Sequence, residues 1–304
     1  MTEQPWTFEE ETTAKLLAKL ARNGARLLDL PAEMSRGSST GNDEVFVIET
    51  GSVSVESEAL RIPVFASDFG RYHFAASGQW RVIFPYQHLD HGFQLPSERE
   101  LRRMWPETYA YLSGHQAALK RRKQFKEWFG YSAPRNLELH ERAQIAVPLL
   151  ADKGLCALIP PELRGCLCPM ASGGFTLTLG AGAKVRPEYV LGLLNSKLLF
   201  WRLRKASNVF RGGWITCTKQ YFGELPIRAI DSTKQADQSR HDRVVTLVEQ
   251  MLGLHRQLAA ARTPHEKTGL QRQIAATDTQ IDRLVYDLYG MTEEEIKVVE
   301  APTQ

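Results

Sequence analysis

The strongest chemical signal in the sequence is a segment rich in basic and aromatic residues. Between Lys184 and Phe222 there are eight Lys or Arg residues and a single acid, Glu188, so this segment has a net charge of +7. Aromatic residues are interleaved with the basic ones: Tyr189, Trp201, Trp214 and Tyr221. Lys and Arg side chains neutralise phosphates, so the pattern favours contact with nucleic acid.

The net charge of the whole chain hides this concentration. The 304 residues together carry a charge of only +3. Residues 1–34 have 4 basic and 6 acidic side chains, and residues 231–304 have 9 and 12. Residues 35–230 have 25 and 17, a surplus of +8. The basic character therefore belongs to the middle of the chain.

Two glycine-containing loops lack the context of a nucleotide or cofactor site. Gly37 and Gly41 in RGSSTGNDEVFVI are four residues apart, no lysine follows, and the loop leads into a strand-like run rather than a helix. Its residues Thr40, Gly41 and Asn42 are typical of a surface turn. Gly180-Ala181-Gly182 follows the strand-like FTLTL, but it does not open the first βα unit of a dinucleotide-binding or S-adenosylmethionine fold. We expect no cofactor in this chain.

The cysteines and histidines do not predict a metal site. Cys166-x-Cys168 has no second ligand pair at zinc-finger spacing, and His88-x-x-His91 has no carboxylate or cysteine partners around it. With Cys156 and Cys217, the four cysteines fit a reducing compartment better than a disulfide framework.

The composition is that of a soluble globular protein, with 43% hydrophobic and 24% charged residues. No apolar run reaches the ~20 residues that span a bilayer, and the acidic N-terminus has no signal-peptide core. We expect a cytoplasmic protein that does not contact membranes.

Short elements of both kinds must position the basic residues. The first 30 residues predict a helix with Leu16, Leu20 and Leu27 on its apolar face, and residues 44–95 contain strand-like runs. A long helical stretch follows from 97 to 130, interrupted around Pro106, and then more short strands and a helix over 186–207. This irregular alternation predicts an α+β fold rather than a doubly wound sheet.

The C-terminal part predicts an antiparallel helical hairpin. Two apolar stripes have heptad spacing, namely Val244, Leu247, Met251, Leu254 and Leu258, then Leu270, Ile274, Thr277, Ile281, Leu284 and Leu288. Thr263-Pro264-His265-Glu266 is a capping box with a first-turn proline, so the second helix should begin there. Gly290 should end it, and Thr292 to Glu295 start a last short helix. A hairpin without a partner and a docking or spacer role both fit.

Six fragments, taken together and in order, resemble a known family. They are SSTGNDEVFVI, WRVIFPY, MWPETYAYLSGHQAALKRR, YVLGLLNSKLLFW, FGELPI and IDRLVYDLYGMTEEEI. This order is similar to that in the C-terminal target recognition part of adenine-specific DNA methyltransferases of restriction–modification systems, the type IIG group with its TaqI-like specificity domain. The resemblance extends over nearly the whole chain from residue 35 onward.

The resemblance implies that the chain recognises a DNA sequence and positions duplex DNA for N6-adenine methylation. Catalytic residues and S-adenosylmethionine would then belong to a methyltransferase domain or subunit, because both the methyltransferase half and a nuclease half of the family are absent. The chain would be a free-standing subunit, half of a split enzyme, or a fragment. Residues 1–34 would be an N-terminal helix that links or docks, 35–230 the recognition domain, and 231–304 the helical hairpin. The turn at Thr40, Gly41 and Asn42 would begin the recognition fold.

On this hypothesis ten residues are candidates for DNA contact. We expect phosphate contacts from Lys120, Arg121, Arg122, Lys123, Arg204, Lys205 and Lys219, and base or groove contacts from Lys184, Arg211 and Trp214. Plainer interpretations exist, since residues 120–123 would also suit the solvated end of a helix and Trp214 the core. Two other classes of function fit the sequence: a scaffold acting through the helical hairpin, and an enzyme whose active site the motifs do not reveal.

Overall fold

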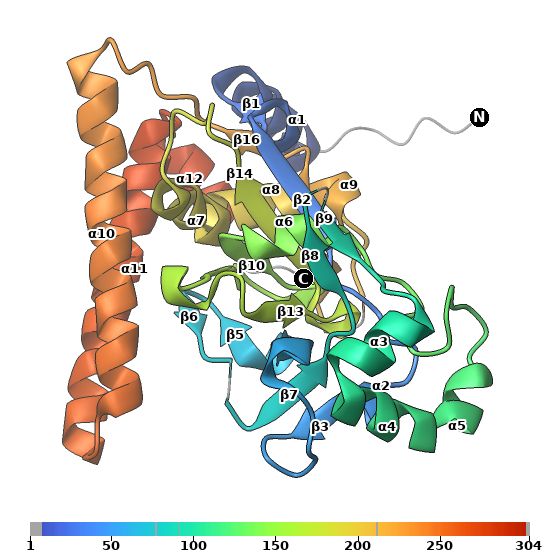
Figure 1. Cartoon of the computed structure of the whole chain (residues 1–304). Coiled ribbons are helices and arrows are strands. Elements are labelled where there is room, and N and C mark those ends of the chain that lie inside the picture. Colours follow the sequence, from blue (N-terminus) through green and yellow to red (C-terminus); the bar gives the residue numbers. More distant parts are fainter. Residues whose placement is uncertain (1–7, 77, 91, 211, 302–304) are drawn as a thin grey trace, which may run out of the picture.

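The computed structural model describes residues 8–76, 78–90, 92–210 and 212–301, and the chain has an α+β fold (Figure 1). The α-helices are α1 (Phe8–Asn23), α2 (Asp43–Phe46), α3 (Glu98–Met104), α4 (Pro106–Gly114), α5 (Gln116–Lys120), α6 (Leu137–Glu141), α7 (Pro187–Asn195), α8 (Lys197–Ala206), α9 (Lys219–Phe222), α10 (Gln235–Ala260), α11 (Pro264–Leu288) and α12 (Glu293–Glu300).

The strands are short. They are β1 (Ala25–Arg26), β2 (Ala32–Arg36), β3 (Val47–Glu49), β4 (Leu60–Val64), β5 (Phe69–Gly70), β6 (His73–Phe74), β7 (Trp80–Ile83), β8 (Gln87–Leu89), β9 (Gly92–Gln94), β10 (Ile145–Val147), β11 (Leu150–Ala151), β12 (Ala157–Leu158), β13 (Leu167–Pro169), β14 (Phe175–Leu179), β15 (Ile215–Thr216) and β16 (Pro226–Ile227).

Two four-stranded sheets organise the body of the molecule. The first has the order β12-β10-β14-β2 with antiparallel neighbours, and all five residues of β14 are buried. The second has the order β13-β4-β7-β3, in which β13 and β4 are parallel. The core beside this second sheet also takes in α3, α4 and α5, with Leu101, Leu112 and Leu119 fully buried.

The predicted helical hairpin is confirmed. Helices α10 and α11 pack along each other and run down one side of the molecule (Figure 1). Met251, Leu254 and Ile281 from the two stripes are buried. The capping box is present as well: the Thr263 hydroxyl accepts the N–H of Glu266 at 3.2 Å, and the Glu266 carboxylate accepts the N–H of Thr263 at 3.0 Å.

The first helix, α1, packs against the C-terminal helices. The ammonium group of Lys19 on α1 donates to the carboxylate of Glu295 and to the carbonyl of Gly290, both at 2.6 Å. Leu16 and Leu20 share one core cluster with residues of α7, α8, α10 and α11. This core therefore contains residues from all three predicted segments, 1–34, 35–230 and 231–304.

Several predicted boundaries were wrong. The N-terminal helix ends at Asn23 instead of continuing to about residue 30, because the chain next pairs β1 with β16. Residues 43–46 form α2 rather than the start of a strand. The predicted helix over 186–207 is two helices, since the Ser196 side chain accepts the N–H of Leu199 at 3.2 Å and starts α8. The helical stretch from 97 ends at Lys120.

Within the described residues, no helix combines the length and the apolar character that crossing a membrane requires.

Candidate nucleic-acid interface

The turn at Thr40, Gly41 and Asn42 lies partly at the surface, as the sequence predicts, since Gly41 is exposed and Asn42 half-buried, but it is anchored by the buried Thr40. Thr40 is fully buried, and its hydroxyl contacts the carboxylate of Asp43 and accepts the N–H of Asn42 at 3.1 Å. Asn42 accepts the N–H of Val45 at 3.3 Å and so caps α2. Gly41 has a φ of +78°, and a Cβ atom there would lie 1.9 Å from the hydroxyl oxygen of Ser132. The position therefore requires glycine.

The guanidinium of Arg122 points at this turn rather than at solvent. Its Nε donates to the carbonyl of Leu119 at 2.8 Å, and Nη1 donates to the carbonyls of Thr40 at 2.6 Å and Gly130 at 2.8 Å. Nη2 donates to the carbonyl of Trp128 at 2.5 Å. Because its donors already bond to the protein's own carbonyls, we replace the predicted phosphate contact of Arg122 with a structural role.

The neighbours of Arg122 face solvent. Lys120 ends α5, and Lys120, Arg121 and Lys123 are all exposed. Residues 116–126 contain five basic residues and no acid, and the ring of Phe125 is 37% exposed beside them. We call the exposed side chains of Lys120, Arg121 and Lys123 the α5 patch. It has the charge and the exposure that phosphate contact needs.

A second group of candidates comes together between α8 and α9. Lys205 at the end of α8 is exposed, with its ammonium group 5.8 Å from the centre of the Trp201 ring. Lys219, the first residue of α9, is exposed as well, and Trp214 between them is 41% exposed. Trp214 is thus at the surface and not in the core. We call Arg204, Lys205, Trp214 and Lys219 the α8–α9 patch.

Arg204 completes this patch. It is half-buried, and a Cβ atom built on Gly213 would lie 3.8 Å from its Nη2, so the guanidinium lies against the loop that carries Trp214. Residues 189–223 contain no Asp or Glu. The cations of the patch are therefore not neutralised by acids from their own segment.

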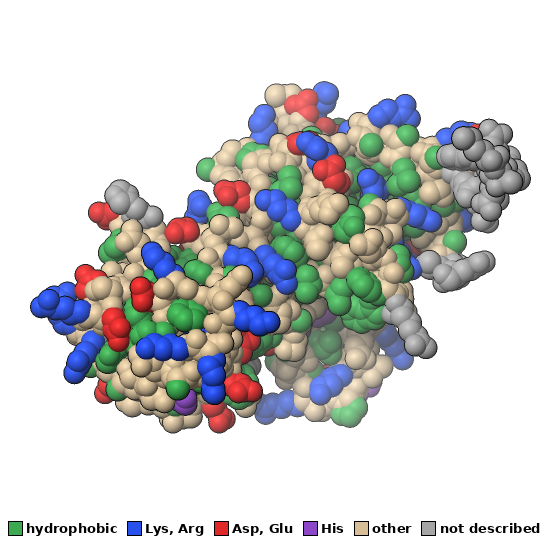
Figure 2. Space-filling model, turned by 90° about the vertical axis from the view of Figure 1, so that its right-hand side faces the viewer, with side chains coloured by type: hydrophobic (Ala, Val, Ile, Leu, Met, Phe, Trp, Pro, Cys, Tyr) green, Lys and Arg blue, Asp and Glu red, His purple; other side chains and the backbone are tan. Residues whose placement is uncertain are grey.

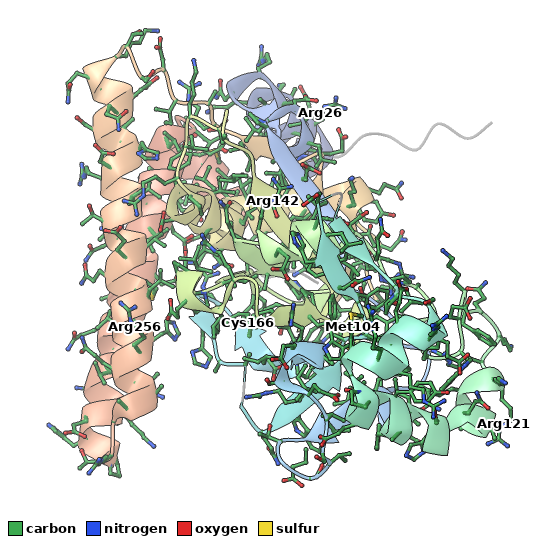
Figure 3. The ribbon with its side chains drawn as sticks, viewed as in Figure 1. Arg26, Met104, Arg121, Arg142, Cys166 and Arg256 are labelled. Carbon is green, nitrogen blue, oxygen red and sulfur yellow. The ribbon has the colours of Figure 1, made fainter. Side chains whose placement is uncertain are left out.

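The two patches lie on one side of the molecule. Helices α5 and α9 are both on the side away from the α10–α11 pair (Figure 1). Figure 2 views the molecule from that side and shows Lys, Arg and hydrophobic side chains interspersed over it, with scattered Asp and Glu side chains among them. Arg121 projects at the outer end of this side, whereas Arg256 is on α10 at the opposite side (Figure 3).

Two predicted contacts do not join this arrangement. Lys184 is exposed, but it lies two residues from Arg186, whose guanidinium pairs with Glu249 on α10 at 2.7 Å. Lys184 is therefore beside the helical hairpin. Arg211 lies outside the described residues.

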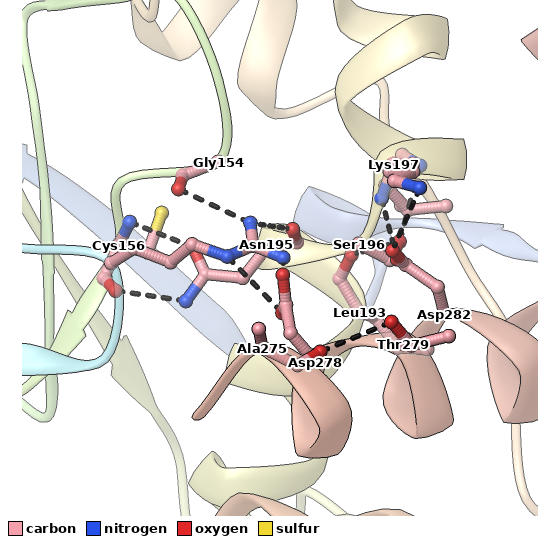
Figure 4. A network of polar contacts seen from close by, with 12 residues as sticks. Gly154, Cys156, Leu193, Asn195, Ser196, Lys197, Ala275, Asp278, Thr279 and Asp282 are labelled. Atoms are coloured by element: carbon pink, nitrogen blue, oxygen red, sulfur yellow. Dashed lines mark hydrogen bonds and ion pairs between the residues drawn. The ribbon is translucent and has the colours of Figure 1, made fainter. Parts of the chain in front are cut away.

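A polar network connects α11 to the junction of α7 and α8 (Figure 4). Nothing in the sequence indicates this network. Arg71 donates to the carboxylate of Asp278 on α11 and to the carbonyl of Asn195 at the end of α7. One carboxylate oxygen of Asp282 accepts the N–H of Lys197 at 2.9 Å, and the other is 3.9 Å from the Lys197 ammonium group. Burial raises the pKa of Asp282 to about 6. The network holds α11 against the junction of α7 and α8.

In the described part of the chain, no group of three or more His, Cys, Asp or Glu residues is placed to hold a metal ion. His140 is buried, and burial lowers its pKa to about 4, so it is a neutral core residue. What the arrangement offers chemically is a surface of cations and exposed rings.

Comparison with models of known protein families gave no match, and no curated protein is detectably similar to the chain. The resemblance noted from the six fragments therefore stays a hypothesis.

Proposed function

We propose that the chain is the DNA target recognition module of a restriction–modification enzyme. It would hold duplex DNA in the cytoplasm while a methyltransferase domain or subunit, which binds S-adenosylmethionine, methylates adenine at N6. One observation carries the proposal: the α5 patch and the α8–α9 patch present unpaired cations and exposed rings on one side of the molecule.

Physical arguments connect these patches to DNA. Exposed Lys and Arg residues that neutralise phosphates release counterions, which supplies most of the sequence-independent affinity. Helices α5 and α9, which carry cations of the two patches, lie at separate places on this side of the molecule (Figure 1), so together the patches suit an extended polyanion better than a single small anion. In the sequence, the exposed Lys205 and Lys219 stand on either side of the exposed Trp214, so a ring and two candidate phosphate contacts share one segment.

The proposed division of labour also follows from the chemistry of base methylation. A methyltransferase must extrude its target adenine from the duplex, at a cost in unstacking and unpairing. A module that holds the duplex through phosphates and groove contacts offsets part of this cost. The catalytic residues would lie in the partner.

Equilibrium binding to short duplex DNA over a range of salt concentrations tests the proposal. The logarithm of the affinity should fall linearly with the logarithm of the salt concentration. Reversing Lys205 and Lys219 to Glu should weaken binding to all sequences and make the salt slope shallower by about 2. Reversing Arg256 and Arg272, which are exposed on the helical hairpin, changes the net charge equally and should leave the slope unchanged.

Binding that does not depend on salt, or an equal loss in the two double variants, would contradict the proposal. The alternative, a scaffold that acts through its helical hairpin, predicts no DNA affinity at moderate salt. One feature favours that alternative: of the two long helices, residues 255–276 are half-buried or exposed, so this end of the hairpin extends beyond the main core.

A further inference from the structure

The loop between α8 and β15 forms a short hairpin whose base is fixed in the core. Val209 and Ile215 form an antiparallel bridge, the N–H of Phe210 donates to the carbonyl of Trp214 at 2.7 Å, and the N–H of Gly213 donates to the carbonyl of Phe210 at 3.1 Å. Gly212 and Gly213, with φ of +83° and +80°, allow the chain to reverse in so few residues. Ile215 at the base is completely buried.

The outward face of this hairpin is apolar. Phe210 and Trp214 are direct cross-strand neighbours, so their rings project from the same face. Strand β11 pairs with β15 and places Leu150 opposite Thr216, two residues from Trp214 and on the same face. Phe210, Trp214 and Leu150 are 52%, 41% and 42% exposed.

Such a concentration of exposed apolar groups is unusual for this molecule. Of the seven large hydrophobic side chains that are exposed in the described residues, four are in this ribbon: Leu150, Val209, Phe210 and Trp214. Scattered single groups of this kind need no explanation, but a contiguous set marks an interaction site.

The surroundings of the apolar face indicate its partner. Arg204 lies against Gly213, and Lys205 on α8 and Lys219 on α9 are exposed on the helices that precede and follow the hairpin. The charges of Asp152 and Lys153, which follow β11, cancel. An apolar face with cations on the neighbouring helices complements a polyanion whose interior is a stack of flat rings. This describes a nucleic-acid duplex, which under the proposed function is DNA.

We propose that Phe210 and Trp214 form a wedge that inserts at a base step of duplex DNA while the neighbouring cations hold the flanking phosphates. This inference rests on the proposed function and adds the mode of contact. Apolar side chains that enter a base step partly unstack it and bend the duplex, and the burial of their exposed surface offsets the cost. The hairpin suits this task because the hydrogen bond between Phe210 and Trp214 and the buried Ile215 at its base position the two rings.

Duplexes that carry a single 2-aminopurine, moved one position at a time, test the wedge, because the emission of this base rises when it loses its stacking neighbours. The wild-type chain should raise the emission at one or two adjacent positions. The double variant Phe210→Ser, Trp214→Ser should abolish this rise and weaken binding about tenfold or more, as expected for lost base–aromatic contacts. Trp80→Ser is the matched control, since Trp80 is 39% exposed at the end of a strand outside the ribbon, and it should behave as wild type.

Both serine variants change exposed side chains, so their urea unfolding midpoints should equal that of the wild type, which shows that they fold. If wild-type protein binds the duplexes with salt dependence but raises the emission at no position, the wedge is overturned, the hairpin becomes a surface for a protein partner, and the proposed function stands. The same conclusion follows if the double serine variant retains the wild-type emission. If the wild-type chain binds no duplex at all, both the proposed function and the wedge are wrong.

Discussion

Replacing Arg122 with alanine should destabilise the fold, whereas replacing its exposed neighbours Lys120, Arg121 or Lys123 should have little effect on stability. The guanidinium donates four hydrogen bonds to carbonyls, all of them on buried residues. The carbonyls of Thr40 and Leu119 retain another donor each, from the N–H groups of Ser132 and of residue 122 itself. The carbonyls of Trp128 and Gly130 would lose theirs.

The expected size follows from these two groups. A buried acceptor left without a donor costs about 1–3 kcal/mol, so the pair gives about 3 kcal/mol after allowance for partial access of water. The guanidinium also lies 5.4 Å from the centre of the Phe46 ring, a contact that adds about 0.5–1 kcal/mol. We therefore expect Arg122→Ala to lower the free energy of unfolding by about 3–4 kcal/mol.

Urea denaturation followed by circular dichroism measures this change, with Arg121→Ala as the matched control. Arg121 is exposed, and its loss should change stability by less than ~0.5 kcal/mol while weakening DNA binding. Two results would refute the structural role of Arg122. One is an unchanged unfolding midpoint in Arg122→Ala. The other is a loss of DNA affinity in that variant, at full stability, as large as in Arg121→Ala.

Three further predictions concern stability and reactivity. Leu254→Asp and Ile281→Asp should each lower the free energy of unfolding by about 4 kcal/mol or more, because each places a carboxylate in the buried seam between α10 and α11, and wild-type melting temperatures would refute that seam. Burial raises the folded-state pKa of Asp282 to about 6, above its unfolded value, so its contribution to stability is complete below pH 4 and is lost as the pH rises through 6. Asp282→Asn should therefore gain stability relative to wild type by about 2 kcal/mol between pH 4 and pH 7.5, and parallel stability curves for the two proteins would contradict this. Finally, a thiol reagent should modify the exposed Cys166 rapidly in the native chain and the other three cysteines only on unfolding, and fast labelling of a second thiol would show that the burial of those three is wrong.

The sequence predicts the regular parts of this fold well, because their signals are local. The heptad stripes and the capping box at Thr263 and Glu266 specify the helical hairpin within about fifty residues of chain. The ends of elements depend on distant partners, and here the prediction was wrong. The helix that the sequence extends to residue 30 ends at Asn23, since the next residues pair with β16 about 200 positions away.

For the candidate interface, too, the sequence shows local features but not the effects of distant contacts. An excess of Lys and Arg is visible in the composition, but the side chains that reach solvent are decided by tertiary contacts. Arg121 and Arg122 are adjacent and chemically identical, yet one is exposed and the other bonds to carbonyls that the turn at residue 40 and the loop before Tyr131 bring to it. The exposed rings of Phe210 and Trp214 become one face only through the pairing of the short hairpin.

The central claim is that this chain recognises a DNA sequence. Repeated selection of bound duplexes from a pool of randomised sequence, with the purified chain at moderate salt, tests it most directly. The account predicts that one short motif becomes enriched, and that the enrichment is lost on replacing Trp214 with serine but kept on replacing Trp80. Bound duplexes that remain as random as the starting pool after several rounds would contradict it.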